Sequence, residues 1–181
     1  MPRSEIPFSR FRMRVFETIG AEWLALTAGT FTPRACNSMT VATAGLGVWF
    51  GKPVAWVFVR PQRYTYQFME RAGDFTLCAF PRRFRAALQL LGSRSGRDTD
   101  KVKEAGLTLI PSAKVEAPGF DEADLILECR KLYFQDLEPA HILDPGLAGK
   151  YPQRDFHRVY CGEVLAAFGA PAYSDNQETP P

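Results

Sequence analysis

The chain has 181 residues, a length that fits one ordinary domain. Hydrophobic residues make up 46% and charged residues 23% of it, which excludes collagen-like, intrinsically disordered and coiled-coil proteins. Because 22 Lys and Arg residues nearly balance 20 Asp and Glu residues, we do not expect a general binder of nucleic acid.

Aromatic residues and chain breakers are both frequent in this sequence. It contains 14 Phe, 6 Tyr and 3 Trp, together with 14 Gly and 14 Pro. This composition favours short strands and turns over long helices. No apolar run reaches the ~20 residues of a membrane-spanning helix, and the N-terminus has no apolar signal core. We therefore expect a cytoplasmic protein without a membrane partner.

The cysteines do not have the spacing of a metal site. Four are present, none of them in a CxxC pair, and only two histidines accompany them. We therefore expect no bound metal. Cys78, Cys129 and Cys161 lie in strand-like segments and are expected in the core. Cys36 borders a polar loop, where a structural role is favoured over a redox role because nothing indicates a depressed pKa.

Strand-like segments follow one another along most of the chain. They cover residues 23–27, 38–44, 53–59, 75–80, 125–134 and 159–166, with a shorter one near 107–110. Residues 45–52 (GLGVWFGK) are typical of a turn. We expect an N-terminal arm at residues 1–18, the folded domain at 19–168 and a flexible, Pro-rich tail at 169–181.

Three short helices are predicted between the strands. One covers residues 64–71 and ends at Gly73 in a left-handed conformation. The second covers 83–91 and ends at Gly92, and the third is capped by Asp98 and ends at Gly106. Since strands and helices do not alternate strictly, the pattern indicates a mainly β barrel or sheet with helical excursions. Neither a Rossmann nor a P-loop glycine motif is present.

The first polar cluster opens the second strand-like segment. Its members are Asn37, Ser38, Met39 and Thr40, followed by a Gly-rich stretch. Amide and hydroxyl groups beside exposed backbone could read the rim of a planar heterocycle. A polar turn before an ordinary strand is the alternative interpretation.

Two further clusters are suited to anions. Arg60, Arg63, Tyr64 and Thr65 lie where a helix begins, so backbone N–H groups and guanidinium groups could bind a phosphate together. The tyrosine could instead serve packing alone. Residues 93–101 combine Ser95, Arg97 and Lys101 in a loop that leads into a helix, and an exposed capped loop is the alternative there.

A single histidine, His157, precedes the last strand-like segment. A lone histidine is more often a hydrogen-bonded structural residue than a catalyst. The sequence has no GxSxG motif, so a Ser-His-Asp triad is not supported.

Taken together and in order, these segments resemble the flavin reductase-like family, whose fold is the FMN-binding split β-barrel of Greek-key type. The residues 37–40 match the family's Asn-x-Met-Thr strand start, and 63–65 resemble its Ser-Arg-Thr phosphate turn. The residues 91–102 resemble its loop before an Asp-Lys helix, and His157 with the later Gly162-Glu163-Val164 resembles its last strand. The resemblance covers residues 20–168.

Two positions depart from the family pattern. Gln62 stands where the family commonly has a hydroxyl residue, and Arg154-Asp155-Phe156-His157 replaces the frequent Gly-Asp-His. The first departure shifts the expected phosphate contacts toward Arg60, Arg63 and Thr65. The residues 45–53 are more similar to flavoredoxins than to the reductase components of two-component monooxygenases.

The resemblance implies non-covalent FMN at a homodimer interface, with NAD(P)H as the reductant. By this resemblance, the isoalloxazine edge and the ribityl chain of FMN would contact Asn37, Ser38, Met39 and Thr40, and the ring would lie near Trp49 and Lys52. The FMN phosphate would be bound by Arg60, Arg63, Tyr64 and Thr65.

The resemblance also implies contacts for a second subunit and for the reductant. The FMN phosphate of the partner subunit, or a phosphate of NAD(P)H, would meet Ser95, Arg97 and Lys101. The nicotinamide would lie beside Tyr160 and the catalytic candidate His157.

The expected activity is hydride transfer from NAD(P)H to the flavin, followed by electron transfer to a downstream acceptor, which could be a protein. An FMN-binding electron carrier or sensor with little NAD(P)H turnover is the main alternative. A module that binds a phosphate-rich ligand or nucleic acid through the basic residues 81–103 is less favoured, because the net charge of the chain is small. A pyridoxamine-phosphate oxidase-like protein is also less favoured, because the motifs match the flavin reductase-like family better.

Overall fold

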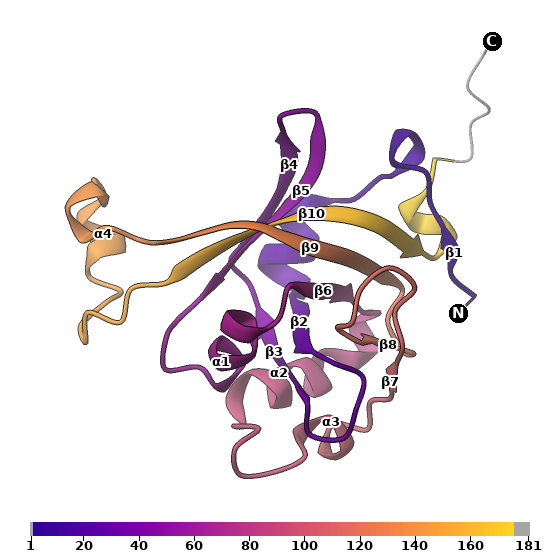
Figure 1. Cartoon of the computed structure of the whole chain (residues 1–181), viewed down its shortest axis with the longest axis horizontal. Coiled ribbons are helices and arrows are strands. Elements are labelled where there is room, and N and C mark those ends of the chain that lie inside the picture. Colours follow the sequence, from indigo (N-terminus) through magenta and orange to yellow (C-terminus); the bar gives the residue numbers. More distant parts are fainter. Residues whose placement is uncertain (1, 176–181) are drawn as a thin grey trace.

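The computed structural model describes residues 2–175, and most of its strands form one curled antiparallel sheet (Figure 1). The strands of this sheet are β1 (Ser4–Glu5), β2 (Leu24–Gly29), β3 (Cys36–Val41), β4 (Ala44–Trp49), β5 (Lys52–Val59), β6 (Asp74–Ala79), β9 (Leu125–Asp136) and β10 (Arg158–Gly169). Two short strands, β7 (Leu109–Ile110) and β8 (Gly119–Phe120), pair with each other separately.

The helices are short and lie between the strands. The α-helices are α1 (Tyr64–Arg71), α2 (Arg85–Ser93), α3 (Lys101–Glu104) and α4 (Pro145–Ala148). A π-helix, η2 (Glu17–Glu22), and the 3-10 helices η1 (Phe8–Arg10), η3 (Arg82–Phe84), η4 (Pro139–His141) and η5 (Pro171–Tyr173) complete the set. The mainly β architecture predicted from the sequence is confirmed.

The order of the strands explains why the sheet closes on itself. The path runs β3-β2-β6-β9-β10-β5-β4, so β3 and β4 stand at its two ends. Yet only residues 42 and 43 join them, and three Cα steps span at most about 11 Å. The two edges must therefore come close, which curls the sheet into a barrel. Among the described strands, β3 and β4 are not paired, so the barrel stays open along this seam.

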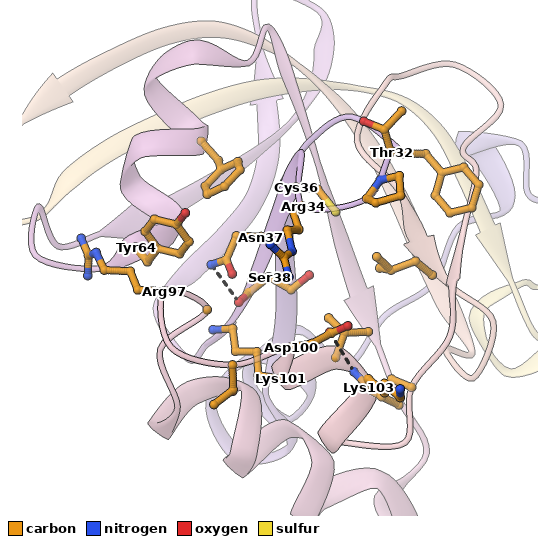
Figure 2. Close-up of a pocket in the computed structure, with 18 of the residues that line it drawn as sticks. Thr32, Arg34, Cys36, Asn37, Ser38, Tyr64, Arg97, Asp100, Lys101 and Lys103 are labelled. Carbon is orange, nitrogen blue, oxygen red and sulfur yellow. Dashed lines mark hydrogen bonds between the residues drawn. The ribbon is translucent and has the colours of Figure 1, made fainter.

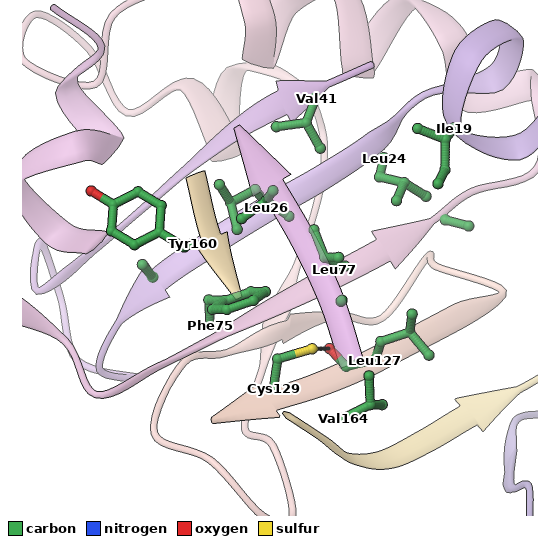
Figure 3. Packing of buried hydrophobic residues seen from close by; sticks show 14 of the residues in the cluster. Ile19, Leu24, Leu26, Val41, Phe75, Leu77, Leu127, Cys129, Tyr160 and Val164 are labelled. Atoms are coloured by element: carbon green, nitrogen blue, oxygen red, sulfur yellow. Dashed lines mark hydrogen bonds between the residues drawn. The ribbon is translucent and has the colours of Figure 1, made fainter. Parts of the chain in front are cut away.

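Two layers of apolar side chains stabilise the barrel. Leu24, Leu26, Phe75 and Leu77 are buried inside it (Figure 3). Alternate residues of the same strands, such as Ala25 and Cys78, face outward and pack with Phe80, Leu88 and Leu91 of the α2 region. Because α2 covers this outer face, β2 and β6 are buried on both faces and lack an apolar-polar alternation.

Several predicted boundaries need correction. Residues 45–52 are not a turn: they form most of β4 and its hairpin to β5. The turn itself is at Phe50 and Gly51, whose φ angles of 47° and 77° are typical of a two-residue hairpin loop. Gly73 is not left-handed, because α1 ends at Ala72 in an extended conformation.

The two later helices also differ from expectation. The helix α2 begins after a 3-10 turn and continues through Gly92 to Ser93. Asp100, not Asp98, caps α3, because its carboxylate accepts a hydrogen bond from the Lys103 backbone N–H at 3.2 Å.

The expected arm and tail lie against the barrel where they are described. The strand β1 pairs with the end of β10, and Ile6 beside it is buried. Phe11 forms a bridge with Ser174, so the first and last parts of the described residues lie side by side. Residues 176–181, the end of the expected flexible tail at 169–181, lie outside the described residues.

The strands β9 and β10 continue beyond the barrel as a long ribbon (Figure 1). Residues 137–157 connect them and carry α4 at the far end. This ribbon places His157 at the point where the chain returns toward β5.

Candidate functional site

Three polar clusters that are far apart in the sequence meet at one cavity of about 1080 Å³ (Figure 2). The cavity lies between the loop joining β2 and β3, the strand β3, the start of α1 and residues 96–109. Five residues predicted from the sequence line it: Asn37, Ser38, Tyr64, Arg97 and Lys101.

Asn37 connects all three clusters. It lies on β3 and is 7% exposed. Its Nδ2 donates a hydrogen bond to Oγ1 of Thr65, in the first turn of α1, at 2.6 Å. A Cβ atom at Gly96 would overlap Asn37 Oδ1, so only glycine lets the loop after α2 pass this close. The amide group therefore fixes a strand, a helix and a loop against one another.

Ser38 and Thr27 form a buried hydroxyl pair behind the cavity wall. Their Oγ atoms are 2.7 Å apart, across the antiparallel pair of β2 and β3. Ser38 also lines the cavity, although its side chain is almost fully buried. Its position is thus set by the strand pairing, and a ligand would meet mainly its backbone and the rim of its hydroxyl.

The start of α1 carries the predicted phosphate residues. Arg63 is the N-cap of α1, and no side chain caps the helix there. The Arg97 guanidinium lies over the Tyr64 ring, 4.8 Å from its centre. Arg63 itself is exposed and donates a hydrogen bond to the Gly92 carbonyl at the long distance of 3.4 Å. Two cationic groups are thus held beside a helix start with capacity for an anion.

Lys101 is a buried cation at the lower wall of the cavity. It is 4% exposed, and its Nζ donates to the carbonyls of Leu91 at 2.9 Å and Arg94 at 3.2 Å. Burial, followed by the nearby Arg63, lowers its pKa to about 8. Lys101 therefore ties α3 to the end of α2 and adds positive charge at neutral pH.

The remaining residues of the first and third clusters attach the cavity wall to the fold. Met39 packs against the barrel core, and Thr40 donates a hydrogen bond to the Leu88 carbonyl of α2. Ser95 accepts a hydrogen bond from the Arg97 backbone N–H at 3.2 Å. These three residues do not line the cavity in the single chain.

Arg60 and His157 belong to a separate polar group, outside the residues that line the cavity. Arg60 pairs with Asp155 at 2.7 Å, and its guanidinium lies over the Tyr151 ring at 4.9 Å. The Tyr151 hydroxyl is 2.7 Å from Nδ1 of His157. Burial and the positive charge of Arg60 lower the pKa of His157 to about 4, so its imidazole is neutral at physiological pH.

Three expected contacts lie elsewhere in the chain. Trp49 belongs to an aromatic cluster with Trp56 and Tyr133, at ring distances of 5.6 and 5.8 Å. Lys52 pairs with Glu163 at 2.8 Å. Tyr160 is a core residue here, because it is fully buried and its hydroxyl donates to Glu70 at 2.6 Å. None of the three faces the cavity in one chain.

Cys36 lines the cavity as a neutral thiol. Burial, followed by the nearby Asp100, raises its pKa to about 11. A thiol with this pKa is a poor nucleophile at neutral pH, which agrees with the expected structural role. The other three cysteines are buried, as predicted.

The sequence reasoning missed Phe31, Arg34, Lys103 and Tyr151. The first three line the cavity, and the last orients His157. Arg34 and Lys103 stand in short polar segments of a kind found on most protein surfaces, so no local signal distinguishes them. Tyr151 is six residues from His157 within an irregular connection, where no periodicity predicts contacts.

The structure also bears on metals and membranes, within residues 2–175. There, no three His, Cys, Asp or Glu side chains are grouped as a metal site would require. Over the same residues, every helix is too short or too polar to cross a membrane.

Comparisons with known proteins identify the family and the fold of this chain. A family model described as a flavin reductase like domain matches residues 27–171. An uncharacterized protein of Pyrococcus abyssi is 29% identical over 112 residues, which are 61% of this chain and 53% of that protein. The chain thus spans about half the length of that curated relative.

Solved structures share the fold. Flavoredoxin of Desulfovibrio vulgaris superposes with a TM-score of 0.66 at 21% identity, covering 88% of this chain and 75% of its own. The Streptomyces globisporus NADH:FAD oxidoreductase, solved with NAD and FAD fragments, gives 0.62 at 17% identity, with 83% and 76% covered. These superpositions show a common fold. With the family model matching most of its length, the chain belongs to the flavin reductase-like family and has that family's split β-barrel.

Proposed function

We propose that this protein binds FMN non-covalently in the cavity and acts as an NAD(P)H-dependent flavin reductase. The observation that carries the proposal is the meeting of residues 37–40, 60–65 and 93–101 around Asn37, within a chain of the flavin reductase-like family. A strand edge with amide and hydroxyl groups and a cationic helix start are complementary to the two ends of FMN.

The donor set of the cavity fits such a ligand. Asn37 and the backbone of β3 would hold the amide-like rim of the isoalloxazine ring. Thr65 is 1% exposed and does not line the cavity in the single chain, so it would act mainly by holding Asn37 in place through the bond to its Oγ1. Arg63 and Arg97 would supply charge-assisted bonds to the same phosphate. Arg60, which is paired with Asp155, would contribute less.

Bound FMN would supply the redox chemistry, taking a hydride from the C4 position of NAD(P)H and passing electrons on to an acceptor. The chain's own task is to orient the ring and to shape the entry of the reductant. We assign His157 to the nicotinamide side. Its Nδ1 is held by Tyr151, which leaves Nε2 as the atom that can meet a substrate amide.

We further propose that the working unit is a homodimer in the cytoplasm. Val48 and Phe50 at the β4–β5 hairpin are 76% and 91% exposed, and Tyr133 and Phe134 of β9 are exposed nearby. Exposed aromatic clusters of this kind mark interaction surfaces. A partner subunit at this surface would bring Trp49 and Lys52 to a shared site. The free cysteines suit a reducing compartment.

The first test is the visible spectrum of the purified protein. We expect the bands of oxidised flavin, or their appearance when FMN is added, and release of FMN on denaturation. Stopped-flow mixing with NADH and with NADPH under anaerobic conditions should then bleach the flavin band.

Two outcomes would change the proposal. A colourless protein that takes up no FMN would overturn it entirely. A yellow protein that millimolar NADH and NADPH fail to bleach would instead favour an electron carrier, the function suggested by its likeness to flavoredoxin.

A further inference from the structure

The segment that leads to His157 is fastened to the turn before α1. Arg60, the first residue of this turn, pairs with Asp155 at 2.7 Å and donates a second hydrogen bond to the Lys150 carbonyl at 3.0 Å. Its guanidinium also lies over the Tyr151 ring. One side chain of the turn thus contacts the segment at three points, although 90 positions along the chain separate Arg60 from Lys150.

Gln62 and residues 154–157 are the two places where the chain departs from the pattern of its family, and they contact each other. Gln62 Nε2 donates a hydrogen bond to Asp155 Oδ2, the oxygen that also accepts from Arg60. Both departures therefore belong to one contact between the turn and the segment.

The carboxylate of Asp155 is only half satisfied. Its side chain is 13% exposed, and Oδ2 receives both hydrogen bonds. Within residues 2–175, Oδ1 is buried and has no hydrogen-bond partner. An unpaired buried carboxylate oxygen lowers the free energy of unfolding, so packing alone does not explain a carboxylate at this position.

Tyr151 extends the contact to His157. Its hydroxyl is 2.7 Å from His157 Nδ1, and its ring stacks on Phe156 at 4.7 Å. The hydrogen bond at one ring nitrogen of a neutral histidine decides which nitrogen holds the proton. A hydroxyl that donates to Nδ1 keeps the proton on Nε2, the nitrogen that we assign to the reductant. Asp155, Arg60, Tyr151 and His157 thus form a continuous series of contacts.

We propose that Asp155 is a positioning residue: it withholds Arg60 from a phosphate at the turn and uses it to fix the segment that carries His157. The inference rests on the proposed function, which puts the FMN phosphate beside Arg63 at the other end of the same turn. The Arg63 N–H donates to the Arg60 carbonyl at 3.0 Å, so both guanidinium groups extend from one short turn. A guanidinium cannot serve a carboxylate and a phosphate fully at once, because both take charge-assisted bonds from the same N–H groups.

The first test compares FMN binding by wild type and Asp155→Asn, followed by flavin fluorescence. Asparagine keeps the shape of the side chain but binds Arg60 without charge, so the guanidinium can turn to the phosphate. We expect the Kd for FMN to fall at least about threefold. In an Arg60→Ala background the same substitution should bring no gain, because the group that moves is absent. The matched control is Asp121→Asn, which removes a carboxylate from an arginine pair at 3.6 Å whose residues do not line the cavity.

The second test measures reduction of the bound flavin by stopped-flow mixing with NADH and with NADPH. Bleaching should be at least about threefold slower in Asp155→Asn, because the segment that carries His157 is no longer fixed. A variant that is merely less stable would bind FMN more weakly. The proposal instead requires tighter binding together with slower reduction.

The third test needs no flavin. Heteronuclear NMR of the histidine side chains should show His157 as a single neutral tautomer, with well separated Nδ1 and Nε2 resonances. In Asp155→Asn and in Tyr151→Phe these resonances should approach each other as the two tautomers mix. The resonances of the exposed His141 should stay unchanged in both variants.

The proposal is wrong if Asp155→Asn binds FMN no more tightly than wild type, if its gain survives without Arg60, or if His157 keeps a single tautomer. Failure of the proposed function is distinguishable from these results. In a protein that takes up no FMN, mixed tautomers in Asp155→Asn would still support the positioning role, and an unchanged spectrum would still refute it. Wild-type FMN affinity and an unchanged spectrum in a yellow Asp155→Asn variant would leave the proposed function intact and refute the positioning role.

Discussion

At the scale of single residues, the site depends on a few polar groups whose partners are fixed by the fold. Asn37 is buried, and without the hydrogen bond to Thr65 its unsatisfied amide group would lower the free energy of unfolding. Arg63 is exposed and has only one long hydrogen bond. The first residue therefore organises the site, and the second is free to meet a ligand.

Arg63→Ala should weaken FMN binding by about 1.5–3 kcal/mol, or roughly 10- to 150-fold in Kd, because a charge-assisted bond to the phosphate is lost. Arg60→Ala should have a smaller effect, since that guanidinium is already paired with Asp155. Fluorescence titration of the flavin measures both. Equal affinity of Arg63→Ala and wild type would show that the phosphate lies elsewhere.

His157 should make the stability depend on pH. Its folded pKa of about 4 is below the ordinary 6.5, so between these values the unfolded chain binds a proton that the folded chain does not. The free energy of unfolding should fall as the pH drops from 6.5 to 4, by up to about 1.4 kcal/mol per pH unit from this group. Burial is the largest cause of this lowered pKa, the charges of Arg60 and Arg63 lower it further, and Asp155 opposes them.

Urea unfolding between pH 4 and pH 7 tests this prediction. His157→Asn should have a flatter profile than wild type, while His141→Asn, at an exposed position, should keep the wild-type slope. Identical slopes for His157→Asn and wild type would contradict the burial of a neutral imidazole.

At the scale of secondary-structure elements, the cavity exists because three elements approach β3 closely. The start of α1 is held by Thr65, α2 by the bond from Thr40 to the Leu88 carbonyl, and the following loop by contact with Gly96. Each contact is made by a small or polar residue, which leaves no trace in a hydrophobic pattern.

Gly96→Ala should disturb both the stability and the site. The new methyl group would overlap Asn37 Oδ1, so Asn37 must move and lose its bond to Thr65. We expect a loss of about 1–3 kcal/mol in the free energy of unfolding and weaker FMN binding. Gly73→Ala is the control, because its Cβ would meet nothing within 4 Å. Chemical denaturation and flavin titration of both variants give the comparison, and an unaffected Gly96→Ala would refute the close approach.

At the scale of the whole molecule, β4, β5 and β9 carry an exposed aromatic surface, which is where we propose that two chains meet. Trp49, Phe50 and Tyr133 form one cluster with ring distances of 5.8 to 5.9 Å. A symmetric dimer would cover this surface, because the same patch of both subunits would be buried in one interface.

Phe50→Asn should weaken that dimer. Asn tolerates the positive φ of 47° at this position, so the change removes the ring without straining the turn. Loss of two buried Phe side chains, at about 1.5–3 kcal/mol each, should raise the dimer Kd by roughly 100-fold or more. Sedimentation equilibrium measures it, with Phe16→Asn as the control at another exposed site. A monomeric wild-type protein at micromolar concentration would exclude the dimer.

Local signals predicted much of this fold. The β-branched run of β5, the apolar run of β6 and the helix over residues 64–71 follow from propensity and periodicity. The hairpin strand β4 does not follow from local signals, because its glycines suggest a turn while its pairing with β5 makes it a strand. The cap of α3 lies two residues later than predicted, because Asp98 and Asp100 are equally good caps in isolation.

The sequence by itself determined the mainly β class, the central helix positions and the polar clusters at residues 37–40, 60–65 and 93–101. These properties depend on residue type and local spacing, which a chain carries before it folds. Only the tertiary structure decided that residues of these clusters line one cavity, together with Arg34 and Lys103. It also decided that Arg60 forms an ion pair with Asp155 and that Tyr160 is buried. Those outcomes depend on how the sheet curls and on contacts between residues far apart in the chain, which no local pattern encodes.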